Sequence, residues 1–114
     1  MKRDVSTPLM HRIVTHGDTV YISGIVAEDL SQSTGGQTRQ IATTLDKLLA
    51  RAGADRTKLL SAQIYMTDMT AKSEMNAVWS EWLETDHMPT RATIGVADLG
   101  PGVLIEIIVT AAVG

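Results

Sequence analysis

The chain has 114 residues, a formal net charge of −3 and 4% aromatic residues, and this length suffices for one domain with a single core, expected over residues 1–114. It contains no cysteine, which excludes disulfides and thiolate metal sites. Because the sequence has no basic run with stacking aromatics, no apolar stretch of about 20 residues and no secretory h-region, we expect a cytoplasmic protein that binds neither nucleic acid nor membrane.

The first half of the chain predicts a β-hairpin followed by a helix. Residues 11–16 and 19–26 are rich in β-branched side chains, and the residues between them suit a tight turn. The Ser, Thr and Gly residues of segment 31–38 predict a loop. A helix is expected over residues 37–52, because apolar side chains recur there at helical spacing. These side chains are Ile41, Leu45, Leu48, Leu49 and Ala52.

The second half predicts a strand, a helix and two further strands. Residues 59–67 alternate between two faces, as a strand does. One face of this strand is expected to hold Leu60, Ala62, Ile64 and Met66, and the other Ser61, Gln63, Tyr65 and Thr67. A helix is predicted over residues 71–84 from its apolar stripe. The last two strands, 90–97 and 103–112, are joined by a Gly-Pro-Gly turn and are expected to form a terminal hairpin.

This order of elements, β-β-α-β-α-β-β, predicts an α+β domain in which both helices pack on one face of a sheet. The final strand is informative because both of its faces are mainly apolar. One face carries Val103, Ile105, Ile107, Val109 and Ala111, and the other carries Leu104, Ile108 and Ala112. The helices can cover only one face, so we infer that the second face is covered by self-association. Loops of the same chain or curvature of the strand are the alternatives.

Two charged residues stand alone in the last two strands. Arg91 lies near the start of one strand and Glu106 lies in the other. A guanidinium that is open to a cleft can bind a carboxylate through two donors, and a glutamate in a partly apolar setting can hold or deprotonate water. From this pattern alone, a buried Arg–Glu ion pair or two strand-end charges that reach solvent are favoured over a site, because ion-pair networks often imitate sites.

Several motifs occur in an order and spacing that resemble one family. Residues 89–91 read Pro-Thr-Arg, residues 105–107 read Ile-Glu-Ile, and residues 20–24 read Val-Tyr-Ile-Ser-Gly. Segment 37–53 resembles the first helix of the same family, and Asn76 resembles an Asn that opens its second helical segment. Together these motifs resemble the RidA/YjgF family of reactive intermediate imine/enamine deaminases, and the resemblance covers nearly the whole chain.

The resemblance implies a chorismate-mutase-like fold assembled as a homotrimer, with the sheets in a central barrel-like core. It implies ligand sites in clefts between subunits, where Arg91 binds the substrate carboxylate and Glu106 positions or activates a water. The implied reaction is the hydrolysis of unstable 2-imino or enamine acids, made by pyridoxal-phosphate enzymes, to 2-oxo acids and ammonia. It needs no metal or cofactor, because a protonated imine carbon is already electrophilic. Ser23, Thr93 and His11 complete the residues expected to bind the substrate.

Three positions depart from the family pattern. Deaminating members carry a Tyr that faces the ligand from the first strand region, and here Met10 or His11 stands in its place. His11 either takes over as a hydrogen-bonding or proton-transfer group, since a His titrates near neutral pH, or is an ordinary strand-edge residue. Ile25 replaces a frequent Gln, and Thr93 replaces a frequent Cys. These changes indicate a divergent subgroup whose cleft takes a different acid.

Two other functions compete with deamination. The missing Tyr favours a non-catalytic protein that binds or senses a small carboxylate, such as a 2-oxo acid, through Arg91. Ribonuclease activity is known for some relatives of the family, but the acidic balance and the few aromatic residues argue against RNA binding. No metal site is expected, because His11, His16 and His87 lack a metal-ligand spacing.

Overall fold

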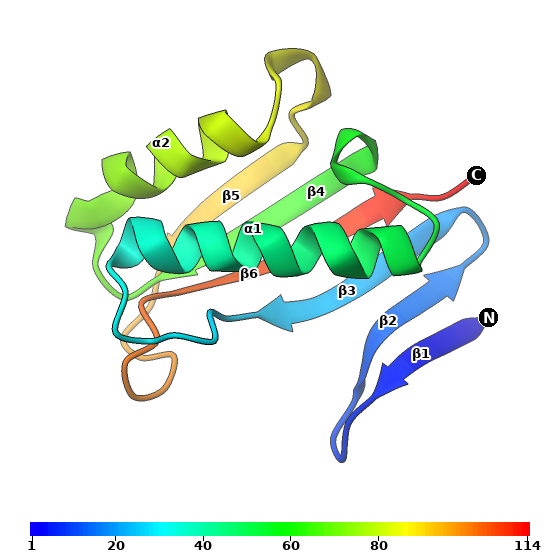
Figure 1. Cartoon of the computed structure of the whole chain (residues 1–114), viewed down its shortest axis with the longest axis horizontal. Helices are drawn as coiled ribbons and strands as arrows, with labels where there is room; N and C mark the ends of the chain where they lie inside the picture. The colour runs from blue at the N-terminus through cyan, green and yellow to red at the C-terminus, as the bar shows by residue number, and fades with distance from the viewer.

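The helices and strands build one sheet layer and one helix layer (Figure 1). The computed structural model describes residues 1–114. Its elements are β1 (Lys2–Ser6), β2 (His11–His16), β3 (Thr19–Ile25), α1 (Thr34–Arg51), β4 (Leu59–Met66), α2 (Lys72–Trp82), β5 (Thr90–Gly95) and β6 (Ile105–Ala112). Short 3₁₀ turns precede β4, α2 and β5. Neither α1 nor α2 has the length and apolarity that a membrane crossing requires.

The six strands form one sheet in the order β1-β2-β3-β6-β4-β5, in which only the β4–β5 pair is parallel. The predicted terminal hairpin of β5 and β6 is therefore wrong, because β4 lies between these two strands. Helix α2 forms the crossover that returns the chain parallel to β4, as a β-α-β unit requires. Segment 96–104 then carries the chain to the other side of β4, so that β6 lies in the middle of the sheet.

A strand that the sequence patterns do not predict, β1, precedes the hairpin. It pairs antiparallel with β2, with Arg3 opposite Val14. Its sequence, Lys-Arg-Asp-Val-Ser, shows no apolar alternation because it lies at the edge of the sheet, where charged side chains discourage pairing with another chain. The predicted order of elements lacks this strand, while the predicted strands at 11–16 and 19–26 are confirmed to within one residue.

The predicted loop over 31–38 is wrong from Thr34 onward, where α1 begins. The side-chain oxygen of Ser33 caps the helix by accepting an amide hydrogen bond at 3.2 Å. Glu74 of α2 accepts a second one, from the amide of Gly35 at 2.8 Å. A Cβ on Gly35 would lie 2.8 Å from Oε1 of Glu74, so this glycine admits the side chain that satisfies a free amide of the first turn.

The core lies between the helices and one face of the sheet. One of the two predicted faces of the last strand is buried, with Ile105, Ile107, Val109 and Ala111 in the core. Val103 was predicted on the same face, but it precedes β6 and is half-buried. The predicted shared face of β4 is wrong at Leu60, which is 46% exposed. The pairing of β4 with β6 is irregular between Leu59 and Ser61, and this local shift turns Leu59 toward the core in place of its neighbour.

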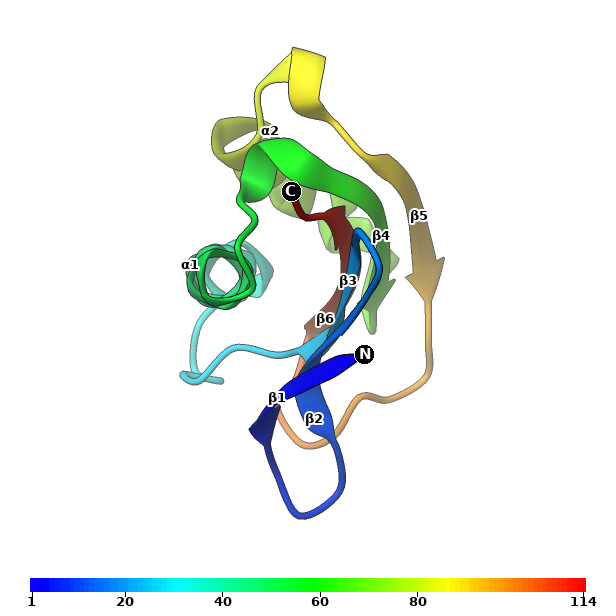
Figure 2. The ribbon, with the colours of Figure 1, turned by 90° about the vertical axis from the view of Figure 1, so that its right-hand side faces the viewer.

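The other face of the sheet has no covering element in the chain. Figure 2, which views the sheet from its edge, shows both helices on the same side. Tyr21 and Ile94 belong to the opposite face and are 50% and 40% exposed, and the alternate residues of β6 on this face are only half-buried. The prediction of an α+β fold with two helices on one sheet face is confirmed.

Two carboxylates hold the two ends of α1. Arg51 donates hydrogen bonds of 2.7 and 3.0 Å to Asp4, and these bonds, together with one from the amide of Val5, lower the pKa of Asp4 to about 2. At the start of the helix, hydrogen bonds from the Gly35 amide and the Ser33 side chain lower the pKa of Glu74. Both contacts therefore depend on ionised carboxylates.

We expect the melting temperature to fall as the pH is lowered from about 5 toward 2. A carboxylate with a lowered folded-state pKa stabilises the fold above its usual pKa, 3.8 for Asp4 and 4.5 for Glu74. This stabilisation is lost as the pH falls, because the unfolded chain then binds more protons than the folded one. Melting curves across this range measure the effect, and Asp4→Asn should show a smaller fall than wild type. A melting temperature that rises toward low pH would contradict the expectation.

Candidate active site

Arg91 lies on the outer strand β5 and belongs to the helix side of the sheet. It pairs with Ala62 of β4, whose side chain is in the core. Its guanidinium carbon lies 5.6 Å from the centroid of the Trp79 ring in α2, a cation–π contact that orients the planar group. Arg91 takes part in none of the three salt bridges of the chain, so its donors remain free for an anion.

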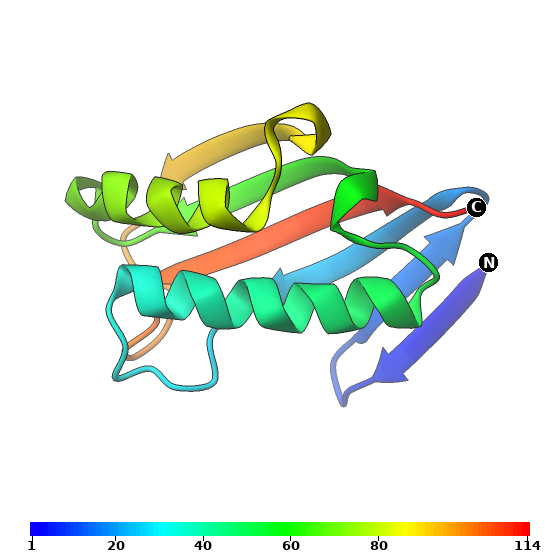
Figure 3. The ribbon, with the colours of Figure 1, turned by 45° about the horizontal axis from the view of Figure 1, so that its top comes forward.

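Two buried polar atoms without hydrogen-bond partners lie on the same side of the sheet. Thr93, two residues along β5, shares the face of Arg91, and its Oγ1 is buried and unpaired. Asn76 lies one helical turn before Trp79 in α2, and its Oδ1 is also buried and unpaired. Figure 3 shows α2 over the half of the sheet that β4 and β5 form. We call Arg91, Thr93, Asn76 and Trp79 the arginine half-site.

Glu106 lies in β6, on the uncovered face of the sheet. It pairs with Tyr65 of β4, whereas Arg91 pairs with Ala62, which points inward. The two charged residues are therefore on opposite faces, with one strand between their own strands. Neither takes part in a salt bridge. The interpretation of Arg91 and Glu106 as an ion pair within one chain is wrong.

The carboxylate of Glu106 lies directly against Gly24 of β3. A Cβ on Gly24 would stand 2.9 Å from Cδ of Glu106, so the absence of a side chain admits the carboxylate. The pairing of β3 with β6 is irregular between Ile22 and Ile25. Ser23 and Gly24 there oppose a single residue of β6 and form a β-bulge. The Oγ of Ser23 is buried without a hydrogen-bond partner.

A hollow of about 330 Å³ opens beside this bulge. Its lining combines the loop between β1 and β2 with the adjoining residues of β2 and β3. The lining residues are Thr7, Pro8, Leu9, Met10, Arg12, Ser23 and Gly24. We call Glu106, Ser23, Gly24 and Met10 the glutamate half-site.

Met10 and His11 are placed differently with respect to this half-site. Met10 lines the hollow together with Ser23, whereas His11 borders another hollow, with Asp4 and Arg51. Successive residues of a strand point to opposite faces, so only one of the two stands where a ligand-facing Tyr was expected. Met10 lies beside Ser23, whereas His11 is separated from both Ser23 and Glu106.

The two half-sites do not meet within one chain. The arginine half-site lies on the outer strand and the helix side, and the glutamate half-site lies on β3 and β6 and the uncovered side. All three buried side-chain polar atoms that lack a hydrogen-bond partner, on Ser23, Asn76 and Thr93, fall in these two places. Buried polar atoms are nearly always paired, so each half-site is incomplete in a single chain.

Comparison with known proteins places this chain in a family. Residues 3–113 match a family model described as Endoribonuclease L-PSP. A RutC family protein of Haemophilus ducreyi is 33% identical over 101 residues, which cover 89% of this chain and 86% of the relative. The chain belongs to the YjgF/RidA family.

Two crystal structures share the YjgF/RidA fold of this chain. An uncharacterized protein from Pseudomonas aeruginosa superimposes with a TM-score of 0.95 at 35% identity, covering 99% of this chain and 98% of the other. NMB1025 from Neisseria meningitidis, a member of the YjgF protein family, has a TM-score of 0.92 at 31% identity, covering 99% of this chain and 94% of the other. The predicted family membership is confirmed.

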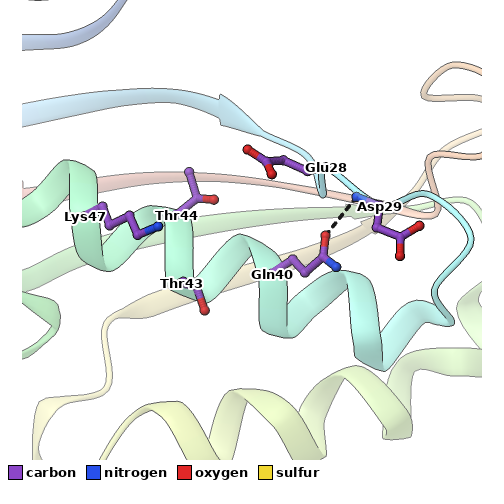
Figure 4. A pocket seen from close by; sticks show the side chains of 6 residues that line it. All are labelled: Glu28, Asp29, Gln40, Thr43, Thr44 and Lys47. Carbon is purple, nitrogen blue, oxygen red and sulfur yellow. Dashed lines mark hydrogen bonds between the residues drawn. The ribbon is translucent and has the colours of Figure 1, made fainter.

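This YjgF/RidA chain has a further polar hollow, of about 220 Å³, between α1 and the loop that follows β3 (Figure 4). It is lined by Glu28, Asp29, Gln40, Thr43, Thr44 and Lys47. The amide of Asp29 donates to Oε1 of Gln40 at 2.9 Å. Hydrogen bonds from Ser31 and Gln32 to its carboxylate lower the pKa of Asp29. No lining residue has a buried polar atom without a partner, so we assign this hollow no ligand.

The lone charges in the last strands point to Arg91 and Glu106, and the family resemblance adds Ser23. Neither predicts that Gly24 contacts Glu106 or that Arg12 lines the hollow. A glycine inside a strand pattern is a signal of close approach by another group, and this signal marks Gly24. No feature of the sequence marks Arg12 as a site residue, because Arg12 lies beside Ser23 only through the pairing of β2 with β3.

Proposed function

We propose that this protein hydrolyses reactive 2-imino and enamine acids to 2-oxo acids and ammonia, in a cleft that joins the arginine half-site of one copy to the glutamate half-site of the next. The observation that carries the proposal is that all three unpaired buried polar atoms lie in two half-sites that do not meet within one chain. A substrate bound between two copies would give these atoms partners. The protein in this proposal is a cytoplasmic homotrimer with three equivalent clefts.

The arginine half-site supplies the hold on the substrate. The Arg91 guanidinium carbon lies 5.6 Å from the centroid of the Trp79 ring, and this contact limits the rotation of the planar group. A guanidinium binds a carboxylate through two parallel hydrogen bonds. Oγ1 of Thr93 and Oδ1 of Asn76 are additional groups that can bind the substrate nitrogen, because a hydroxyl and an amide oxygen both accept hydrogen bonds.

The glutamate half-site supplies the water. In the proposed reaction Glu106 accepts a proton from a water molecule as the water oxygen bonds to the carbon of the protonated C=N group. Glu106 then gives that proton to the nitrogen. As the carbon–nitrogen bond breaks and ammonia leaves, Glu106 accepts the hydroxyl proton, the carbonyl forms, and the proton passes on to ammonia or solvent. An enamine first takes up a proton at carbon and becomes the iminium. Gly24 allows the carboxylate to lie close to the β3 backbone at this point.

Exposed apolar residues lie where such clefts would form. Leu9 and Met10, in the loop between β1 and β2, are 89% and 51% exposed, and Met69 and Ile94, beside and in β5, are each 40% exposed. β5 is also an edge strand with Arg91 as its single charge, and the unpaired backbone groups of an edge strand can pair with another chain. Contact of the hairpin side of one copy with the β5 side of the next is heterologous, and such a contact forms a closed ring when the rotation between copies is a third of a turn, as the proposed trimer requires.

A second candidate function is the binding or sensing of a small carboxylate without turnover. The observation that favours it is Met10, which lines the hollow where a Tyr hydroxyl was expected. A thioether donates no hydrogen bond and transfers no proton. Arg91, which lies over the Trp79 ring, could still bind a carboxylate when Met10 replaces the Tyr.

Ammonia release tests the proposed activity. Imines are generated in situ by an amino-acid oxidase from several amino acids, and ammonia release is compared without protein, with wild type and with Arg91→Ala. We expect wild type to accelerate the release and Arg91→Ala to lose the acceleration, because the substrate carboxylate loses its charged donors. Light scattering verifies that the variant keeps the assembly of wild type.

A folded wild-type oligomer that accelerates no imine would overturn the deaminase proposal. Calorimetry then tests the second candidate with pyruvate and 2-oxoglutarate as the probes. Binding of either probe that is lost in Arg91→Ala would establish a carboxylate-binding protein, and binding of neither probe would exclude that function as well.

A further inference from the structure

We infer that the acid bound in this cleft carries a second acidic group, which Arg12 binds. The substrates would then be dicarboxylic 2-imino or 2-oxo acids, an inference that rests on the proposed function. Arg12 lies on β2 and lines the hollow beside the β3 bulge. It takes part in no salt bridge and donates none of the side-chain hydrogen bonds of the chain. Its charge is therefore available within the hollow.

The order of groups around the hollow separates the two ends of such a ligand. Ile13 pairs with Ile22, so Arg12 is adjacent to Ser23 at the start of the bulge. Glu106 lies against Gly24, on the far side of Ser23. A carboxylate is repelled by Glu106 and attracted by Arg12, and the unpaired hydroxyl of Ser23 offers it a further donor. The second acidic group would therefore lie at Arg12, with the reacting carbon toward Glu106.

The wall between these groups suits the methylene groups of a short dicarboxylic acid. Pro8, Leu9 and Met10 line the hollow with apolar side chains, and its volume of about 330 Å³ accommodates a small acid. Arg12 is exposed in the single chain. A ligand with a purely apolar side chain would fill the same space without giving the guanidinium a partner. If a second copy covers the hollow, such a ligand is disfavoured, because enclosing an unpaired charge is costly.

A pair of probes of similar length tests the inference through binding alone. Calorimetry compares 2-oxoglutarate with 2-oxohexanoate, which lacks the second carboxylate, on wild type and on Arg12→Gln. Wild type is expected to bind 2-oxoglutarate about 10- to 100-fold more tightly than 2-oxohexanoate, from the hydrogen bonds of one charged group. Arg12→Gln should remove this preference, and Arg12→Lys should restore part of it.

Arg3→Gln is the matched control. It removes the same charge from the neighbouring strand β1, outside the hollow that Arg12 lines, and should keep the preference for 2-oxoglutarate. The inference would be overturned if wild type bound the two probes equally well or bound neither. It would also be overturned if Arg12→Gln lost affinity for both probes equally or dissociated into single chains.

The outcome of this test is separable from that of the deaminase proposal. A preference for 2-oxoglutarate that depends on Arg12, in a protein that accelerates no imine, would support the second acidic group and overturn deamination. Acceleration of many imines by a wild-type protein without that preference would support deamination and overturn the role of Arg12.

Discussion

Gly24→Ala is expected to lower the rate of imine hydrolysis by about 100-fold, while the protein stays folded and assembled. The added Cβ would stand 2.9 Å from Cδ and 3.3 Å from Cγ of Glu106, which is too close for both groups to keep their places. The end of the Glu106 side chain is the part that can move, so the carboxylate shifts and the strand does not. A base displaced by about 1 Å loses its alignment with the attacking water.

Gly36→Ala is the matched control for this substitution. A Cβ on Gly36 would stand 2.6 Å from Oε1 and 2.9 Å from Cβ of Gln32, so this substitution also crowds a neighbouring residue, but Gly36 lies in α1 and in neither half-site. Initial rates of ammonia release and melting temperatures are measured for both variants. We expect Gly36→Ala to keep the wild-type rate. If Gly24→Ala kept the wild-type rate, Glu106 beside Gly24 could not be the group that activates the water.

The elements of this fold follow from local patterns, but the order of strands in the sheet does not. The alternation of β6 and the apolar stripe of α1 repeat along single segments, so a short window of sequence contains them. Segment 100–102, Gly-Pro-Gly, is typical of a hairpin turn, yet β4 lies between the strands on either side of it. That placement depends on the crossover through α2, which no local window contains.

The missed strand and the misplaced helix start have the same kind of cause. β1 is an edge strand, and the charged side chains that protect such an edge remove the apolar alternation by which strands are predicted. The first turn of α1 contains two glycines, which predict a loop. One of their amides is satisfied by Glu74, 39 residues away in the sequence. Both β1 and the first turn of α1 therefore depend on contacts that form only in the folded chain.

The sequence and its family resemblance nominate residues of the candidate site but do not predict its geometry. Arg91 and Glu106 are detectable as single charges in apolar strands, and the resemblance to the YjgF/RidA family assigns them roles. Their places on opposite faces follow from the register of β4 with both of its neighbours. The hollow beside Ser23 follows from a bulge of one residue, and the free charge of Arg12 is apparent only when its surroundings are known.

A mixture of two inactive variants is expected to regain activity, because the proposed cleft takes one half from each of two copies. Arg91→Ala keeps its glutamate half-site, and Glu106→Gln keeps its arginine half-site. When equal amounts of the two chains assemble at random, about a quarter of the clefts combine two intact halves. The mixture should therefore reach about a quarter of the wild-type rate, whereas each variant alone should stay near the spontaneous rate.

The two chains are unfolded together in denaturant and refolded, and native mass spectrometry verifies that mixed oligomers have formed. The matched control mixes Arg91→Ala with the double variant Arg91→Ala/Glu106→Gln. This mixture contains no intact arginine half-site and should remain inactive. If mixed oligomers of the two single variants form but regain no activity, the proposal of a cleft shared between two copies is overturned. The register makes recovery the expected outcome, because Arg91 and Glu106 belong to opposite faces of one sheet and cannot both reach a small acid from the same chain.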